Sequence, residues 1–174
     1  MNRDHIPYVL YDLALAIGGE VRLDALLVKT LQRLLFHTGY PVGLVLLDQT
    51  HTEQVARGRL HAVIGDHGIL ARRGSVLELP APLLEGSSRL FDDAADLAPL
   101  GGSRRYGYGL RLPVGQTGTI LLLSEVPVAG SGMLRQVLQP VLRNFDRAIR
   151  LCRDSEALTQ TLESDPARSR NLLP

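Results

Sequence analysis

Arginine and tyrosine side chains are concentrated in one short stretch of the sequence, GGSRRYGYGLRL. The stretch contains Arg104, Arg105, Tyr106 and Tyr108, and it leads into an apolar run that is typical of a strand. Guanidinium groups bind phosphates and carboxylates through forked hydrogen bonds, and they stack on planar rings. The stretch therefore predicts a site for an anionic or aromatic small ligand. The alternative is a solvated turn whose tyrosines pack on a sheet.

The histidines and one acidic trio are the side chains in this sequence that could bind a metal ion. Of the scattered histidines, His61 and His67 lie six residues apart, and imidazole commonly binds metals and haem iron. Neither histidine has a partner motif, so a structural or surface role is favoured, and no metal or haem is expected. His61 is kept as a ligand-binding candidate. Asp92, Asp93 and Asp96 lack the glycine and terminal glutamate of a calcium loop.

The sequence lacks the motifs of the commonest enzyme classes. It contains no serine nucleophile elbow, no phosphate-binding loop, and no HExxH or CxxC pair. Its one cysteine, Cys152, excludes an intramolecular disulfide and a zinc site built from several thiolates, which fits a reducing, cytoplasmic location. We expect no catalytic residues and no enzymatic activity. An enzyme with an unrecognised site remains the third alternative for function.

The length and net charge of the chain limit the number of domains and the kinds of partner that are expected. A chain of 174 residues that is 45% hydrophobic fits one domain with terminal extensions. We assign residues 1–163 to this domain and residues 164–174 to a disordered tail or linker. The net charge of +1 predicts neither a nucleic-acid partner nor a charged membrane surface. The longest apolar runs are far shorter than the roughly 20 residues that a membrane span requires.

Helical patterns open the chain and strand patterns follow. Residues 6–17 carry apolar side chains at helical spacing before a Gly-Gly stop, and a leucine stripe over residues 23–35 ends at Thr38-Gly39. Residues 41–48 and 54–65 indicate one hairpin.

A second hairpin is indicated by residues 106–115 and 117–126, and its later strand is apolar enough to be central. Between the hairpins, residues 66–105 predict one short strand broken by proline and one helical turn. So long an irregular segment is typical of a ligand lid.

The last pattern, Met133 to Asp165, predicts an amphipathic helix roughly 45 Å long that overhangs a small domain. Pro140 predicts either a kink or a helix that begins with this proline in its first turn. Two adjacent apolar stripes indicate that the helix meets a partner helix as well as its own domain. We therefore predict a homodimer through the terminal helices, with an interface made by Leu10, Leu138, Leu142, Phe145, Ile149 and Cys152.

This order of elements resembles the GAF domain. The segment LAIGGEVRLDALLVKTLQRLLFHTGYPVGLVLLD is similar to the opening helices and first strand of the family. LRLPVGQTGTILLLSE is similar to its final hairpin, and LQPVLRNFDRAIRLCRDSEAL to its closing helix. The likeness spans Tyr8 to Glu163 and implies an α+β, PAS-related fold. In that fold an antiparallel sheet of five or six strands carries the N-terminal and long C-terminal helices on one face and pocket loops on the other.

The resemblance implies a regulatory or sensory domain of a bacterial signalling protein. Such a domain binds a small molecule or partner and signals through its terminal helices to an effector of the sensor kinase or diguanylate cyclase type. A bilin is disfavoured because Cys152 lies in the closing helix, and methionine sulfoxide reductase activity is disfavoured because that branch needs several cysteines.

The alternative is an interaction or dimerisation scaffold whose pocket is filled by its own side chains. An empty cavity beside Arg104, Arg105 or His61 favours sensing, whereas a filled compartment with a large dimer seam favours the scaffold.

Overall fold

Two helices open the chain, as the leucine pattern predicts. The computed structural model describes residues 3–165, beginning with η1 (Arg3–His5), α1 (Ile6–Gly18) and α2 (Leu23–Thr38). The predicted stop of α2 is confirmed, because Gly39 has a φ of 82° and its N–H donates to the Leu35 carbonyl at 3.0 Å. Only glycine adopts this left-handed conformation without steric cost.

Six strands form one antiparallel sheet in the order β3-β2-β1-β6-β5-β4. The strands are β1 (Val42–His51), β2 (Val55–Ile64), β3 (Val76–Pro80), β4 (Arg89–Phe91), β5 (Tyr108–Val114) and β6 (Gly118–Ser124). Both predicted hairpins, β1–β2 and β5–β6, are confirmed. Every residue of β6 is buried, as expected for a central strand whose two faces are both covered.

The segment between the hairpins contains more regular structure than its sequence predicts. It holds α3 (His67–Leu70), β3, α4 (Ala81–Leu84), β4, α5 (Ala94–Leu97) and η2 (Ala98–Leu100). The expectation of one strand and one helical turn was therefore wrong. The strands β3 and β4 are only five and three residues long, too short to display a period, and they form by pairing with β2 and β5.

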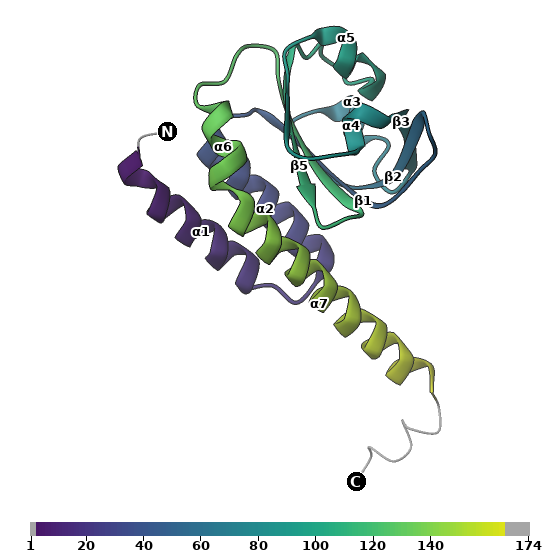
Figure 1. Cartoon of the computed structure of the whole chain (residues 1–174). Helices are drawn as coiled ribbons and strands as arrows, with labels where there is room; N and C mark the ends of the chain where they lie inside the picture. Colours follow the sequence, from purple (N-terminus) through teal and green to yellow (C-terminus); the bar gives the residue numbers. More distant parts are fainter. Residues whose placement is uncertain (1–2, 166–174) are drawn as a thin grey trace.

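The closing helix is divided at Leu138 into α6 (Ser131–Val137) and α7 (Gln139–Ser164). Pro140 lies in the first turn of α7, where its missing N–H costs no helical hydrogen bond, so this form of the prediction is confirmed. With 26 residues, α7 is about 39 Å long. Its last turns project beyond the rest of the domain (Figure 1). Residues 166–174 of the predicted tail lie outside the described residues.

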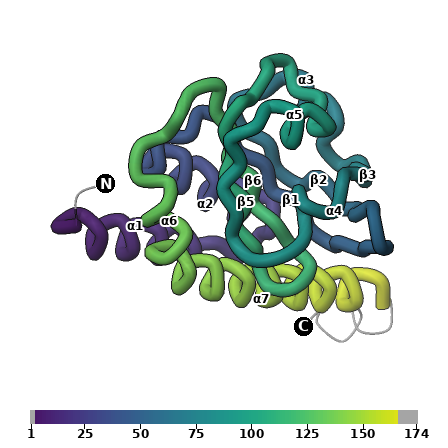
Figure 2. Tube along the Cα trace, turned by 45° about the horizontal axis from the view of Figure 1, so that its top comes forward, coloured from purple at the N-terminus to yellow at the C-terminus, as the bar shows by residue number. Residues whose placement is uncertain are grey.

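The sheet separates two apolar compartments. The helices α2 and α7 contact one face and α1 packs on both of them, while α3, α4 and α5 lie over the other face (Figures 1 and 2). Alternate residues of β1 supply the two compartments, because side chains along a strand point to opposite faces. Val45 and Leu47 enter the helix-side core, whereas Leu44 and Leu46 enter the loop-side core.

Candidate functional site

The loop-side compartment, where a pocket was expected, is occupied by apolar side chains. Ile69, Leu83 and Leu97 from the segment over the sheet belong to one buried cluster with Leu121 and Leu123 of β6. Close packing of this kind is typical of a protein core. The compartment therefore has the filled character that the scaffold alternative expects.

Asp66 and Tyr106 form a buried hydrogen bond beside this compartment. Asp66 caps α3 by accepting from the Ile69 N–H at 2.9 Å, and it also accepts from the Ser103 N–H at 2.9 Å and from the Tyr106 hydroxyl. Burial raises the pKa of the Asp66 carboxyl, but these hydrogen bonds outweigh burial and hold that pKa well below its ordinary value. Burial raises the pKa of Tyr106, and the hydrogen bond to Asp66 and the charge of that carboxylate raise it further.

The contact between Asp66 and Tyr106 requires a glycine at position 102 and gives Tyr106 a structural role. A Cβ at Gly102 would lie 2.6 Å from Asp66 Oδ2 and 2.8 Å from the Tyr106 ring, so only glycine allows the approach. Tyr106 is 4% exposed and its hydroxyl bonds to Asp66, which gives it a structural role; its role in ligand binding stays a prediction. Sequence reasoning missed Asp66, although an aspartate just before a helical turn is a capping signal.

The other members of the predicted ligand site do not converge. Arg104 and Arg105 are exposed, and Tyr108 is half-buried at the start of β5. His61 lies on the opposite face of the sheet, where it meets α7, so the structure does not bring it together with the arginines. The physical reason is a β-bulge at His61: Val45 pairs with Ala62 and Leu46 with Leu60, leaving His61 as an extra residue.

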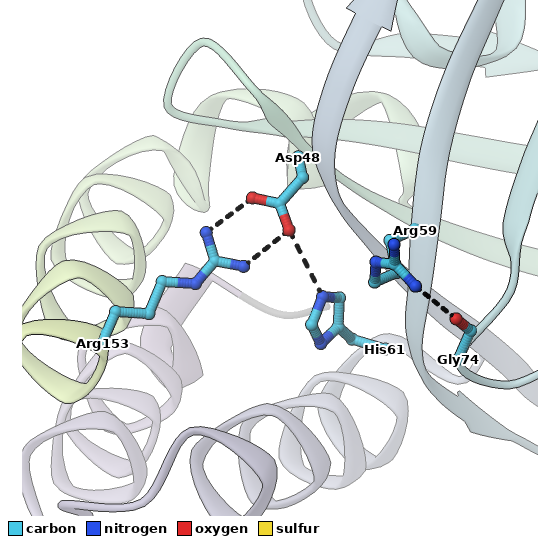
Figure 3. Close-up of polar contacts among 5 residues, drawn as sticks. All are labelled: Asp48, Arg59, His61, Gly74 and Arg153. Atoms are coloured by element: carbon cyan, nitrogen blue, oxygen red, sulfur yellow. Dashed lines mark hydrogen bonds and ion pairs between the residues drawn. The ribbon is translucent and has the colours of Figure 1, made fainter. Parts of the chain in front are cut away.

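His61 belongs instead to a polar junction between the sheet and α7 (Figure 3). The guanidinium of Arg153 makes two bonds to the Asp48 carboxylate, from Nη1 to Oδ1 at 2.7 Å and from Nη2 to Oδ2 at 2.9 Å. His61 Nε2 lies 3.7 Å from Asp48 Oδ2. Hydrogen bonds from Arg153 lower the pKa of Asp48, whereas burial, followed by the charge of Arg153, lowers the pKa of His61.

The backbone at Asp48 is shaped for this junction. Asp48 has a φ of 57°, and it is the one non-glycine residue with positive φ in the described part of the chain. It interrupts the β1–β2 register between Leu47 and Thr50, which turns its carboxylate toward α7. Aspartate tolerates the left-handed region better than most residues do. Local strain at this position is thus coupled to contact with the closing helix.

A second contact ties α7 to α2 one turn later. Glu156 Oε1 accepts a hydrogen bond from the Leu23 backbone N–H at 2.9 Å. The N-cap residue of α2, Arg22, makes no side-chain cap bond, so a carboxylate 133 residues away in the sequence satisfies one of the free N–H groups of α2. Arg153 and Glu156 therefore mark where α7 leaves the domain.

The apolar face of α7 is covered by its own domain. Leu138, Leu142, Phe145, Ile149 and Cys152 are all buried in the helix-side core of a single chain, and Leu10 is partly buried against it. The five buried side chains are closed off from a partner, so their assignment to the dimer interface was wrong, whereas Leu10 remains partly accessible. Both stripes are buried because α7 contacts the sheet on one side and α1 and α2 on the other. Burial also raises the pKa of the Cys152 thiol.

Other apolar side chains remain on the outer surface of the helices. On α1, Tyr8, Tyr11 and Leu15 follow one another at helical spacing and are exposed. On α7, Leu151 and Leu158 are exposed seven residues apart. Such side chains in a row are typical of a protein contact surface.

No protein-family model and no curated protein matches the sequence. Solved structures do match. The GAF domain of an Acinetobacter phosphoenolpyruvate-protein phosphotransferase aligns with 91% of this chain and 98% of its own, at 16% identity and a TM-score of 0.65. The chain has the GAF fold. The GAF domain of a putative sensor histidine kinase from Pseudomonas syringae pv. tomato aligns with 91% of this chain and 94% of its own, at 18% identity and a TM-score of 0.63.

GAF-fold proteins include an enzyme as well as signalling domains. The free methionine-R-sulfoxide reductase of Neisseria meningitidis, solved with its substrate, is 15% identical with a TM-score of 0.65 and covers 86% of this chain and 91% of its own. The fold by itself therefore leaves catalysis open. Within residues 3–165, no three His, Cys, Asp or Glu side chains are grouped to hold a metal ion. No helix there has the length and apolar character needed to cross a membrane.

Proposed function

We propose that this GAF-fold domain is a regulatory module that transmits a signal through α7 to an effector beyond the helix, of the sensor kinase or diguanylate cyclase type. The observation that carries the proposal is the divided environment of α7. Residues from Val141 to Cys152 are anchored in the core, whereas the residues from Ala157 to Ser164 are exposed along their whole length. A helix anchored at one end and projecting at the other transfers small rotations or shifts of the domain to whatever follows it.

The junction of Asp48, Arg153 and His61 lies at the boundary between these two parts. It joins the sheet to α7 through the partly exposed ion pair of Arg153 with Asp48, which is weak enough to be altered by a small change in free energy. The apolar core below it fixes the first half of α7. The junction is therefore the place where a change in the sheet would reach the projecting half.

We also propose that the domain acts as a homodimer through its outer helical surface. Two of the three packed helices carry exposed apolar side chains: α1 carries Tyr8, Tyr11 and Leu15, and α7 carries Leu151 and Leu158. Association of two copies would bury these side chains, which is favourable at about 25 cal/mol per Å² of apolar surface. It would also bring two copies of α7 together, as a two-helix output requires.

The proposal is tested by joining residues 1–164 to a cyclase or kinase module that lacks its own input domain. Zero to seven residues are inserted between residue 164 and the output module, and the output activity is measured for the wild type and Arg153→Gln. We expect output to vary with the helical period of the insertions and to change in Arg153→Gln. Arg57→Gln is the matched control, because Arg57 forms an ion pair with Glu78 on the far strands, 2.9 Å apart, and does not touch α7.

A second candidate function, the scaffold, is favoured by the filled loop-side compartment. In a scaffold the domain dimerises, but its helix carries no change of state. Output that is independent of insertion length and identical in Arg153→Gln and Arg57→Gln would favour the scaffold over the regulatory module.

A further inference from the structure

A groove lined by arginines lies on the side of α7 that faces the end of the β5–β6 hairpin. Its volume is about 680 Å³. One wall carries Arg143, Arg147 and Arg150 of α7, and the other is made by Ser87, Ser88 and Gly115. Figure 2 shows α7 passing the tip of this hairpin. The groove is separate from the loop-side compartment, and none of the residues predicted from the sequence to bind a ligand lines it.

The charges on the α7 wall are only partly balanced. Arg150 Nη2 donates to Asp146 Oδ2 at 2.7 Å. The side chains of Arg143 and Arg147 make no ion pair or hydrogen bond with any other side chain or backbone group in the described part of the chain. Three guanidinium groups and one carboxylate leave an excess of two positive charges, and guanidinium groups stay protonated at all physiological pH values.

A further cation stands behind the opposite wall. The side chain of Arg111 is buried, 5% exposed, and donates to the Ser87 carbonyl at 2.7 and 3.2 Å and to the Pro82 carbonyl. Within residues 3–165 it forms no ion pair with a carboxylate. A buried charge is screened by salt much less than an exposed one, so Arg111 adds to the positive potential at Ser87 and Ser88. These contacts also fix the loop that forms this wall.

We propose that this groove binds a small molecule carrying two or more linked phosphate groups, such as a nucleoside triphosphate. Arg143 and Arg150 are about 10 Å apart along the helix axis, a span over which three forked donors can surround a compact polyanion. The volume of about 680 Å³ falls in the range of small-molecule sites. Pro113 and Leu142 also line the groove and offer apolar surface to a sugar or base.

A compact phosphate chain fits the groove better than an acidic peptide does. Linked phosphates place several charges within a few ångströms, where all three arginines can reach them. A peptide carries one carboxylate per acidic side chain, and same-face side chains of a strand repeat only every 6.6–6.8 Å or so.

Calorimetric titration of the full chain tests the proposal. The probes are inorganic tripolyphosphate and ATP in low salt with EDTA, and the variants are the double substitutions Arg143→Gln/Arg147→Gln and Arg57→Gln/Arg59→Gln. The second is a matched control, since it removes the same charge from exposed arginines elsewhere. We expect saturable binding that weakens at least about tenfold in the first variant, because each lost phosphate contact is charge-assisted. The control should bind within about twofold of the wild type.

Three results would overturn the proposal: no saturable binding of either probe, equal weakening in both variants, or tighter binding of a glutamate-rich peptide than of either phosphate probe. Thermal melts of both variants verify folding, and exposed arginines should change the melting temperature little. The titration reads binding to this chain alone. It can therefore fail while output through α7 stands, and the output test can fail while the groove still binds phosphate.

Discussion

The substitution Arg153→Gln tests whether the polar junction holds α7 at the point where it leaves the domain. Glutamine keeps most of the length of the side chain and its polar end, but it removes the charge and the fork that grips Asp48. We expect the core to remain folded, since Phe145 and Ile149 anchor the first half of α7 independently. The residues from Arg153 to Ser164 should open more often.

The size of the stability loss in Arg153→Gln follows from the geometry and the solvent exposure of the ion pair. The two bonds at 2.7 and 2.9 Å are a well-formed bidentate pair, but the side chains of Arg153 and Asp48 are 37% and 49% exposed, so solvent screens most of the attraction. We expect a loss of about 0.5–1 kcal/mol in the free energy of unfolding. That loss should lower the melting temperature by about 1–4 °C in a chain of this size. Local opening of α7 should become about two- to fivefold more frequent.

Hydrogen exchange measured by mass spectrometry reports the local opening of α7, and urea denaturation reports the loss in the free energy of unfolding of the whole domain. A double-mutant cycle with Asp48→Asn isolates the pair, because asparagine also tolerates the positive φ of 57° and leaves the backbone unchanged. We expect a coupling energy of about 0.5–1 kcal/mol. Arg150→Gln is the matched control, because its ion pair with Asp146 lies within α7 and does not involve the sheet.

Two outcomes would refute the reasoning. If Arg153→Gln and Asp48→Asn are additive, the contact contributes nothing measurable to stability. If exchange in the second half of α7 changes as much in Arg150→Gln as in Arg153→Gln, the sheet does not anchor the helix.

Four further predictions concern the core, the histidine and the outer surface. Asp66→Ala should cost about 3 kcal/mol in urea denaturation, because it leaves the buried Tyr106 hydroxyl without its acceptor; an unchanged midpoint would contradict the role of this pair. Burial lowers the pKa of His61 below 6.5, so stability is full above that pH and falls as pH drops toward the folded-state pKa; His61→Gln should flatten this loss below pH 6.5. Tyr11→Glu should give a folded monomer in light scattering, and a wild-type monomer at tens of micromolar would refute the dimer. Ile149→Glu should instead unfold the domain, at a cost of about 4 kcal/mol or more, because Ile149 is 5% exposed.

Local signals in the sequence were sufficient for the main elements. The leucine stripe and Gly39 specified α2, the apolar runs specified β1 and β6, and Pro140 marked the start of α7. Each of these depends on the period or conformational limits of residues close together in the chain, which the sequence displays directly. The order of elements was enough to suggest the GAF fold that the solved structures support.

The candidate sites depended on contacts between distant residues. A one-residue bulge turned His61 toward α7, and the sequence could not reveal it because pairing with β1 decides the register. Asp48, Arg153 and Glu156 became important only when β1, α2 and α7 were brought together. The apolar stripes of α7 gave the width of its buried face correctly, but not the identity of what covers it. Periodicity is a property of one helix, whereas burial depends on every element that packs against it, so only the tertiary structure could distinguish a core from a dimer interface.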